Sequence, residues 1–338
     1  MRQSDEQRHI RAAMAAAFPD AEARVARYYA MQEYHLGWRD EQLQPADSDP
    51  GKLIRPRLSL IACRAVGGDP IRALPLAAGI QLIHDFSLIH DDIEDDSATR
   101  RGRPTLWTIW GLAQGINAGD GMLVIAHLAI HRLSSNGIAP EVVLEILRRF
   151  DETILTICEG QYLDLLQEGD LTIDEAAYLA MIGRKTAALI AAAAGLGALV
   201  GGGSADQVAA LTEFGTALGL AFQIQDDLLG IWGDPAITGK PAAADLYRRK
   251  LSLPVIHALR HAPHAAALAD LLQQPEPDHQ DVQRMLAIIE EAGSRAATEA
   301  VAATHHARAL AALDAVIGDA AALGELRALT GALLGRTA

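Results

Sequence analysis

Apolar residues recur every three or four positions along most of this chain, whereas the strict alternation typical of a half-buried strand is almost absent. This pattern predicts helices over residues 74–93, 123–133, 142–166, 173–194, 207–228 and 282–313. Abundant Ala and Leu, with aromatic residues at only 4%, agree with a high helix propensity. The sequence therefore predicts an all-α protein.

Clusters of Gly and Pro fall between these segments, where helices are expected to end. The segment 187–200 is apolar on nearly every side, which predicts a helix at the centre of a large bundle. No fixed-period repeat and no low-complexity linker divides the 338 residues. We therefore expect one domain that covers residues 1–338.

Amino-acid composition and net charge limit the kinds of partner and the location that we expect for this protein. The chain has 43 acidic and 29 basic side chains and a net charge of −14, which disfavours a nucleic-acid partner. Cys63 and Cys158 lie in apolar periodic segments, so we expect both to be buried in a protein of a reducing compartment. No apolar run approaches the roughly 20 residues of a membrane span. We expect a cytoplasmic protein without stable membrane insertion.

An acidic cluster follows the apolar segment 82–89. Five of the six residues 91–96 are acidic, and on a helix Asp91 and Asp95 share one face with Asp92 beside them. Like charges so placed repel one another and oppose the dipole of a helix C-terminus. A solvated helix end would explain the run, but carboxylates at this spacing also suit Mg²⁺ that is shared with substrate phosphates.

A second Asp pair, Asp226-Asp227, ends another apolar segment 135 residues after the first. Basic residues follow both clusters: Arg100 and Arg101 after the first, and Lys240 and Lys250 after the second. Either cluster alone is weak evidence. Together they indicate two carboxylate groups that hold Mg²⁺ ions on a polyphosphate.

With the elements around them, these residues resemble the trans-isoprenyl diphosphate synthases, the polyprenyl synthetase family. The resemblance runs from about residue 51 to 254. Its elements are Gly51-Lys52 with Arg55-Pro56, His84, Asp91-Asp92 with Asp95, residues 100–105, Gly119-Asp120, Gly160-Gln161 with Asp164, Lys185-Thr186, Phe222-Gln223, Asp226-Asp227, Gly239-Lys240-Pro241, Asp245 and Lys250. The family implies an isoprenoid-synthase-type bundle of ten or more helices around a deep central cavity, with both Asp clusters at its mouth.

The resemblance also implies an activity, the condensation of isopentenyl diphosphate with an allylic diphosphate, and a homodimer. It assigns up to three Mg²⁺ ions to Asp91, Asp92, Asp95, Asp226 and Asp227. It assigns the substrate diphosphates to Lys52, Arg55, His84, Arg100, Arg101, Lys240 and Lys250. It assigns catalytic roles, leaving-group neutralisation and dipoles toward the carbocation, to Lys185, Thr186 and Gln223.

Two positions depart from the family pattern, and one of them is Ser252, where the family usually has Thr. Gly230 stands where the second Asp motif normally has its third Asp. We expect this departure to affect the third metal site more than the activity. We also expect Gly230→Asp to be tolerated or to improve metal affinity.

Product length is predicted from the residues just before Asp91. Phe86, five residues back, is about 7.5 Å along the helix axis, and its neighbour Ser87 is small. In the family, an aromatic residue there with a small neighbour accompanies short products. We therefore expect the C20 product geranylgeranyl diphosphate, with C15 farnesyl diphosphate as the alternative.

Two other functions remain open at this point. A class I terpene cyclase also uses an Asp-rich helix end, but it would carry an Asn/Ser/Glu metal motif in place of Asp226-Asp227 and has no use for Lys52 and Arg55. A non-catalytic partner subunit of a synthase would lose one or both Asp clusters. Both clusters persist here, apart from Gly230.

Overall fold

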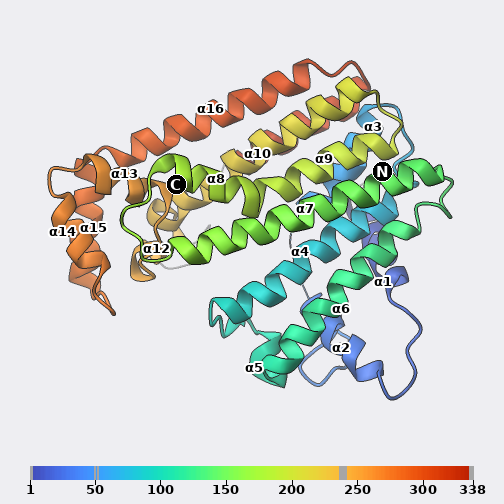
Figure 1. Cartoon of the computed structure of the whole chain (residues 1–338), viewed down its shortest axis with the longest axis horizontal. Coiled ribbons are helices and arrows are strands. Elements are labelled where there is room, and N and C mark those ends of the chain that lie inside the picture. Colours follow the sequence, from blue (N-terminus) through green and yellow to red (C-terminus); the bar gives the residue numbers. More distant parts are fainter. Residues whose placement is uncertain (1–2, 49–50, 52, 236–241, 335–338) are drawn as a thin grey trace. The chain divides into compact units, whose positions relative to one another are not determined.

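The computed structural model describes residues 3–48, 51, 53–235 and 242–334, and it confirms the all-α prediction (Figure 1). The only strands among these residues are two of two residues each. The elements are α1 (Gln3–Ala17), α2 (Ala26–His35), α3 (Ile54–Ala65), α4 (Leu74–Glu94), β1 (Thr99–Arg100), β2 (Arg103–Pro104), α5 (Leu106–Trp110), α6 (Leu112–His131), α7 (Pro140–Gln167), α8 (Glu175–Ile182), η1 (Gly183–Ala187), α9 (Ala188–Val200), α10 (Ala205–Trp232), α12 (Ala244–Tyr247), α13 (Leu253–His261), α14 (Ala265–Leu272), α15 (His279–Glu291), α16 (Ser294–Asp314) and α17 (Ala320–Leu334).

The chain divides into two compact units. Unit 1 comprises Met1–Asp151 and Ala193–Val208, and unit 2 comprises Glu152–Ala192 and Ala209–Ala338. The long helices α7, α9 and α10 contribute residues to both units. The expectation of a single domain around a deep central cavity stays a prediction.

Helix α4 is the centre of unit 1, and it packs against α1, α3 and α6. Its side chains Leu76, Ile80 and Ile83 are buried, as the periodic apolar pattern predicts. Gly79 permits the close approach of α6, because a Cβ there would lie 2.6 Å from Cδ1 of Ile130. This packing fixes the helix whose last turn carries the first acidic cluster.

In unit 2, the segment predicted as one helix over 173–194 consists of α8, the π-helical turn η1 and α9. Tyr178 on α8 is buried with Ile224 of α10 and Leu253 of α13 in one apolar cluster. A π-turn inside an α-helix often marks a functional site. Here it carries Lys185 and Thr186.

Two expectations were wrong. The segment 282–313 is two helices, α15 and α16, because Gly293 adopts φ +67° and ends the first. Cys158 is exposed, whereas Cys63 is buried as expected. A Cys in a periodic segment can lie on the outer face of its helix, so the apolar pattern around Cys158 could not show whether its side chain is buried.

One continuous helical stretch, Glu175–Val200, has the length and composition of a membrane span. Of its most apolar window, 61% is buried inside the structure. Core helices of soluble proteins have the same character. We interpret this stretch as the buried helix that the pattern over residues 187–200 predicts.

Candidate active site

The three acidic residues of unit 1 that were predicted to bind metal lie at the end of α4 and differ in burial. Asp95 is exposed and Asp91 is half-buried, whereas Asp92 is only 1% exposed. Asp92 accepts a hydrogen bond of 2.7 Å from Nε of Arg100. Burial raises the pKa of Asp92, and the Arg100 charge opposes that shift. Asp91 and Asp95 keep exposed surface at which an ion can bind, whereas Asp92 is covered by the protein.

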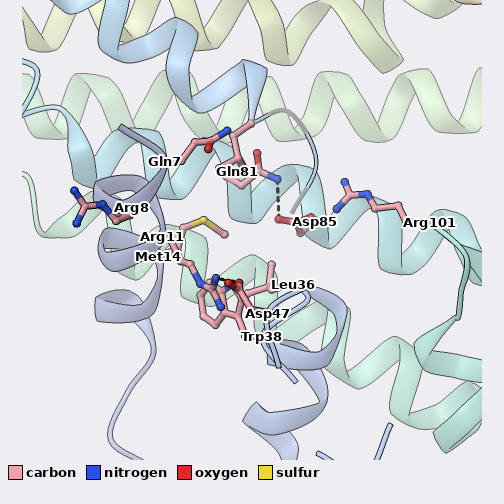
Figure 2. A pocket seen from close by; sticks show the side chains of 11 residues that line it. Gln7, Arg8, Arg11, Met14, Leu36, Trp38, Asp47, Gln81, Asp85 and Arg101 are labelled. Carbon is pink, nitrogen blue, oxygen red and sulfur yellow. Dashed lines mark hydrogen bonds and ion pairs between the residues drawn. The ribbon is translucent and has the colours of Figure 1, made fainter. Parts of the chain in front are cut away.

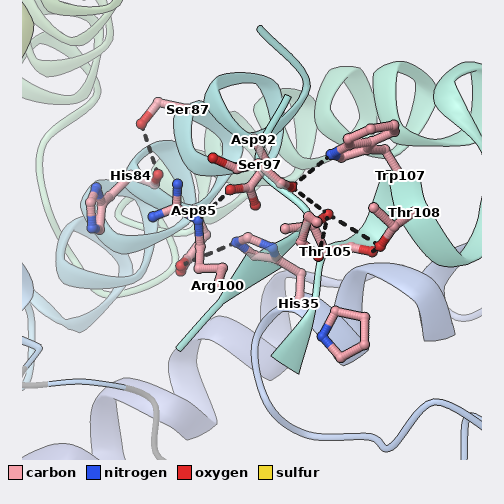
Figure 3. A network of polar contacts seen from close by, with 12 residues as sticks. His35, His84, Asp85, Ser87, Asp92, Ser97, Arg100, Thr105, Trp107 and Thr108 are labelled. Atoms are coloured by element: carbon pink, nitrogen blue, oxygen red, sulfur yellow. Dashed lines mark hydrogen bonds and ion pairs between the residues drawn. The ribbon is translucent and has the colours of Figure 1, made fainter. Parts of the chain in front are cut away.

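Arg100 reaches Asp92 because it lies in a short hairpin formed by β1 and β2 (Figure 3). Both turn residues, Arg101 and Gly102, have positive φ, which is the conformation of a tight type I′ turn. The hairpin is anchored by Thr105, whose Oγ1 donates to the carbonyl of Ser97 at 2.8 Å. The sequence reading did not predict this hairpin, which explains why an Arg-Arg-Gly sequence follows the acidic turn.

Three of the predicted substrate-binding side chains of unit 1 lie near one another. Nη1 of Arg55 is 3.4 Å from Nε2 of His84. The guanidinium of Arg101 lies against Gly51, since a Cβ on Gly51 would be 3.3 Å from Nη2 of Arg101. Burial, then the charges of Arg55 and Arg101, hold the pKa of His84 well below its ordinary value. His84 is therefore neutral. Lys52, the fourth predicted residue, lies outside the described residues.

A buried pair, His35 and Asp85, was missed by the sequence reading. Nε2 of His35 is 3.8 Å from Oδ1 of Asp85 (Figure 3). Oδ2 of Asp85 accepts a hydrogen bond of 2.9 Å from Nε2 of Gln81 (Figure 2). Burial raises the pKa of Asp85 to about 6 and lowers the pKa of His35 to about 3. No signal in the sequence pairs these residues, because they are 50 positions apart.

Asp85 and Gln81 also line a cavity of about 230 Å³ in unit 1 (Figure 2). Leu53 and Arg101 border it, so the cavity adjoins the predicted diphosphate-binding residues. The remaining lining residues are Gln7, Arg8, Arg11, Met14, Leu36, Trp38 and Asp47. None of the three predicted metal ligands of unit 1 borders this cavity.

The predicted chain-length residues lie on different faces of α4. Phe86 is 9% exposed, and its ring stacks edge-on against His90 with centroids 4.9 Å apart. His90 in turn fills the space over Gly119 of α6, where a Cβ would be 2.1 Å from its Nε2. Ser87 is half-buried on the Asp91 face, whereas Phe86 lies roughly 140° around the helix from Asp91 at about 100° per residue.

The π-turn η1 brings together the predicted catalytic residues of unit 2. Nζ of Lys185 donates to Oδ2 of Asp164 at 2.6 Å, and Oγ1 of Thr186 donates to Oε1 of Gln223 at 3.0 Å. Gly160 of α7 makes the approach possible, since a Cβ there would lie 2.3 Å from the backbone nitrogen of Lys185. Gly160 and Asp164 therefore hold α7 close to the π-turn.

Asp227 is fully buried and is bonded by the protein from several sides. The hydroxyl of Tyr178 and the backbone nitrogen of Leu253 donate to Oδ2, and Nε2 of Gln223 donates to Oδ1 at 3.3 Å. Nζ of Lys250 lies 3.9 Å from Oδ1. Burial raises the pKa values of both Asp227 and Tyr178, so the proton of Tyr178 stays on the phenol.

The neighbouring Asp226 is half-buried, so part of its surface stays exposed to solvent. Asp227 was predicted to bind metal, but hydrogen-bond donors of the protein occupy both of its carboxylate oxygens. Like Asp92, it is therefore buried and bonded by the protein. Asp226 is the member of this pair that can present its carboxylate to an ion.

The structure corrects the expectation for Gly230. A Cβ on Gly230 would lie 2.1 Å from Oδ2 of Asp245, whose side chain is buried. The carboxylate of Asp245 occupies the space that a third Asp side chain would take. Gly230→Asp would therefore collide with a like charge, and it is not expected to be tolerated. Lys240 lies outside the described residues.

The donor chemistry of these groups fits a hard divalent cation. Asp91, Asp95 and Asp226 offer accessible carboxylate oxygens, and oxygen ligands suit Mg²⁺. Arg55, Arg100, Arg101 and Lys250 supply the cations that phosphate groups bind.

Comparison with known proteins agrees with this chemistry. Residues 38–289 match the family model named Polyprenyl synthetase. The chain is 42% identical over 302 residues to a geranylgeranyl diphosphate synthase of Mycobacterium tuberculosis, covering 88% of this chain and 85% of that protein. It is 40% identical over 279 residues to a (2E,6E)-farnesyl diphosphate synthase of the same species, covering 80% and 76%. A polyprenyl synthetase structure from Streptomyces coelicolor superposes with a TM-score of 0.90 at 34% identity, covering 98% of both chains.

Proposed function

Because the chain belongs to the polyprenyl synthetase family and is a short-chain prenyltransferase, we propose that it is a Mg²⁺-dependent geranylgeranyl diphosphate synthase. Members of this family use isoprenyl diphosphate substrates and a divalent metal. The predicted synthase function is confirmed at this level, and neither the terpene cyclase nor the non-catalytic subunit is supported. Mg²⁺ itself, the C20 product and the roles of individual residues belong to the proposal.

We assign the allylic diphosphate to the accessible carboxylates Asp91, Asp95 and Asp226, through metal. Bound Mg²⁺ would neutralise the charge that develops on the departing pyrophosphate. Asp92 and Asp227 act differently: each is buried and bonded, so each fixes the backbone that presents its neighbour. This assignment reduces the five predicted ligands to three.

Isopentenyl diphosphate must stay intact, so its phosphates need cations without a metal cage. Arg55 and Arg101 supply planar guanidinium groups for this purpose. His84 is neutral and can serve as a hydrogen-bonding partner without adding charge. Lys52 completes the proposed group from its place in the sequence.

The π-turn residues face the reacting centre in this proposal. The side-chain amide of Gln223 is oriented at both ends, because Oε1 accepts from Thr186 and Nε2 donates to Asp227. Fixed dipoles stabilise developing charge without reorganising during the reaction. Lys185 is held by Asp164 and is placed to bind a leaving phosphate.

A single observation carries the proposal: two Asp pairs, each with one partly exposed and one buried carboxylate, in a chain of this family. The test is incubation with isopentenyl diphosphate and farnesyl diphosphate, with and without Mg²⁺. We expect a C20 diphosphate, abolished by EDTA and restored by Mg²⁺. A cyclic hydrocarbon, or no turnover with any allylic diphosphate, would contradict the assignment.

Product length is assigned to the α4 residues before Asp91. Phe86→Ala is expected to lengthen the product if its ring closes the chain path. Ser87→Phe places a ring on the Asp91 face instead and is expected to shorten the product to C15. If Phe86→Ala leaves the product unchanged while Ser87→Phe shortens it, Ser87 and not Phe86 sets the floor.

We also propose a cytoplasmic homodimer. Large apolar side chains are exposed on α6, among them Val124 at 57%, and on α7, among them Leu144 at 67% and Leu155 at 62%. Exposed large apolar side chains on helices are typical of subunit interfaces. Light scattering is expected to show a dimer, and Val124→Glu with Leu144→Glu is expected to shift it to monomer. A monomeric wild-type protein at micromolar concentration would overturn the proposal.

A further inference from the structure

Three potential metal-ligating side chains of unit 2 lie close together, and none of them belongs to the Asp clusters. Glu175 begins α8, and His257 and His261 lie one turn apart on α13. One potential ligand atom from each lies within 4.8 Å of the other two. Nε2 of His261 lies 3.9 Å from Oε1 of Glu175.

The spacing of the two histidines suits a single ion. Residues at i and i+4 lie on the same helix face, and the imidazole rings of His257 and His261 are 4.5 Å apart between centroids. Ligands bound at about 2.1 Å to one tetrahedral ion lie about 3.4 Å apart. His261 is 58% exposed, so rotation of its side chain can close the small remaining gap.

His257 has the hydrogen bond that metal-binding histidines typically have. Its Nδ1 lies 2.9 Å from Oγ of Ser294, a residue with no exposed surface. A partner on one ring nitrogen fixes the ring and directs the other nitrogen, here Nε2, toward a ligand. Burial and the neighbouring His261 lower the pKa of His257, which favours the neutral form that binds metals.

The backbone on both sides of the cluster is anchored. Arg260, next to His261, donates to the carbonyls of Thr172 and Ile173 in the turn before α8. Asp174 caps α8 by accepting from the backbone nitrogen of Ala177 at 2.8 Å. These contacts hold the first turn of α8 against the last turn of α13 without any ion.

We propose that Glu175, His257 and His261 bind a transition-metal ion, Zn²⁺ or one of similar preference, as a clamp between α8 and α13. Two imidazoles and one carboxylate suit Zn²⁺, whereas Mg²⁺ prefers oxygen ligands alone. Water completes the coordination. The site is separate from the carboxylates assigned to the diphosphate, and it does not depend on the prenyltransferase assignment.

The test is titration of the metal-stripped full-length protein with Zn²⁺, and with Co²⁺ for its visible spectrum, in excess Mg²⁺ that occupies oxygen-only sites. We expect one saturating equivalent, a tetrahedral Co²⁺ spectrum and a rise in melting temperature with Zn²⁺. His261→Ala and Glu175→Gln are expected to weaken binding at least tenfold, and Ser294→Ala about tenfold.

His264→Ala is the matched control. Its Nε2 lies 3.9 Å from Glu291, so it tests an exposed His–Glu pair outside the proposed cluster. It should bind Zn²⁺ as the wild type does. Because His261 is exposed, its variant should fold, and circular dichroism checks this. Equal affinity in wild type and His261→Ala, or an octahedral Co²⁺ spectrum unchanged by that substitution, would overturn the proposal.

Discussion

The two Asp pairs look alike in sequence but are supported differently. In both, the first Asp is half-buried and the second is fully buried. Asp92 is held by Arg100, from a hairpin eight residues away in the chain. Asp227 is held by side-chain and backbone donors from three segments of unit 2, including the neutral hydroxyl of Tyr178.

The two pairs stabilise a buried carboxylate in different ways. A buried carboxylate needs compensation, either from an opposite charge or from several hydrogen bonds. The first pair uses a local cation that can also meet substrate. The second combines several hydrogen bonds with the more distant charge of Lys250, so the loss of one donor leaves others in place. The predictions below test this contrast.

The largest effect is expected from the accessible members. Asp91→Ala and Asp226→Ala should each lower kcat about a hundred- to a thousandfold, because each removes a carboxylate proposed to hold metal. Steady-state kinetics at saturating Mg²⁺ measures this effect. Asp96→Ala, in the exposed turn after α4, is the control and should retain most activity. Near-normal rates in Asp91→Ala would refute its role.

A pH-dependent effect is expected from Asp85. Its folded pKa of about 6 exceeds the ordinary 3.8, so the folded state favours the protonated acid. The contribution to stability is therefore present below about pH 4 and is lost as the pH rises through 6. Asp85→Asn should raise the free energy of unfolding at pH 8 by up to about 3 kcal/mol, with little gain near pH 4.

Denaturant unfolding at several pH values checks this prediction. His35 gives the opposite sign, since its folded pKa of about 3 lies below the ordinary 6.5. The contribution of His35 to stability is lost as the pH falls from 6.5 toward 3. His35→Gln should therefore make the free energy of unfolding less dependent on pH over this range. An Asp85→Asn profile parallel to that of the wild type would contradict the raised pKa.

The two clusters differ at their third position, which is Asp95 in unit 1 and Gly230 in unit 2. Gly230→Ala should destabilise the protein by about 1–3 kcal/mol through collision with Asp245, and Gly230→Asp should cost more. Gly324→Ala on α17 is the control, because nothing lies within 4 Å of its added Cβ. The control should be neutral or stabilising by up to about 1 kcal/mol. Thermal melts compare the pair, and equal melting temperatures would contradict the clash.

The smallest effect compares the two anchors directly. Tyr178→Phe should cost about 1 kcal/mol, because Asp227 keeps its other donors. Arg100→Met should cost about 2 kcal/mol, because Asp92 loses a charge-assisted bond. Chemical denaturation measures both without reference to activity. A larger loss in Tyr178→Phe than in Arg100→Met would reverse the proposed contrast.

Much of the fold was accessible from local pattern. The predicted boundaries of α4, α7 and α10 agree with the structure within a few residues, because apolar periodicity reports the buried face of a long helix. The π-turn and the hairpin were missed. Each depends on a close approach from elsewhere, such as Gly160 against Lys185, which no local periodicity encodes.

The candidate site divides in the same way. The sequence by itself determined the family, the helical class and the residue types proposed to bind diphosphate and metal, because these depend on composition, period and motif order. Only the tertiary structure decided which Asp of each pair is accessible, why Gly230 must lack a side chain, and that His35 meets Asp85. Burial and hydrogen-bond partners come from segments distant in sequence, so a motif can name an acidic residue without revealing what surrounds its carboxylate.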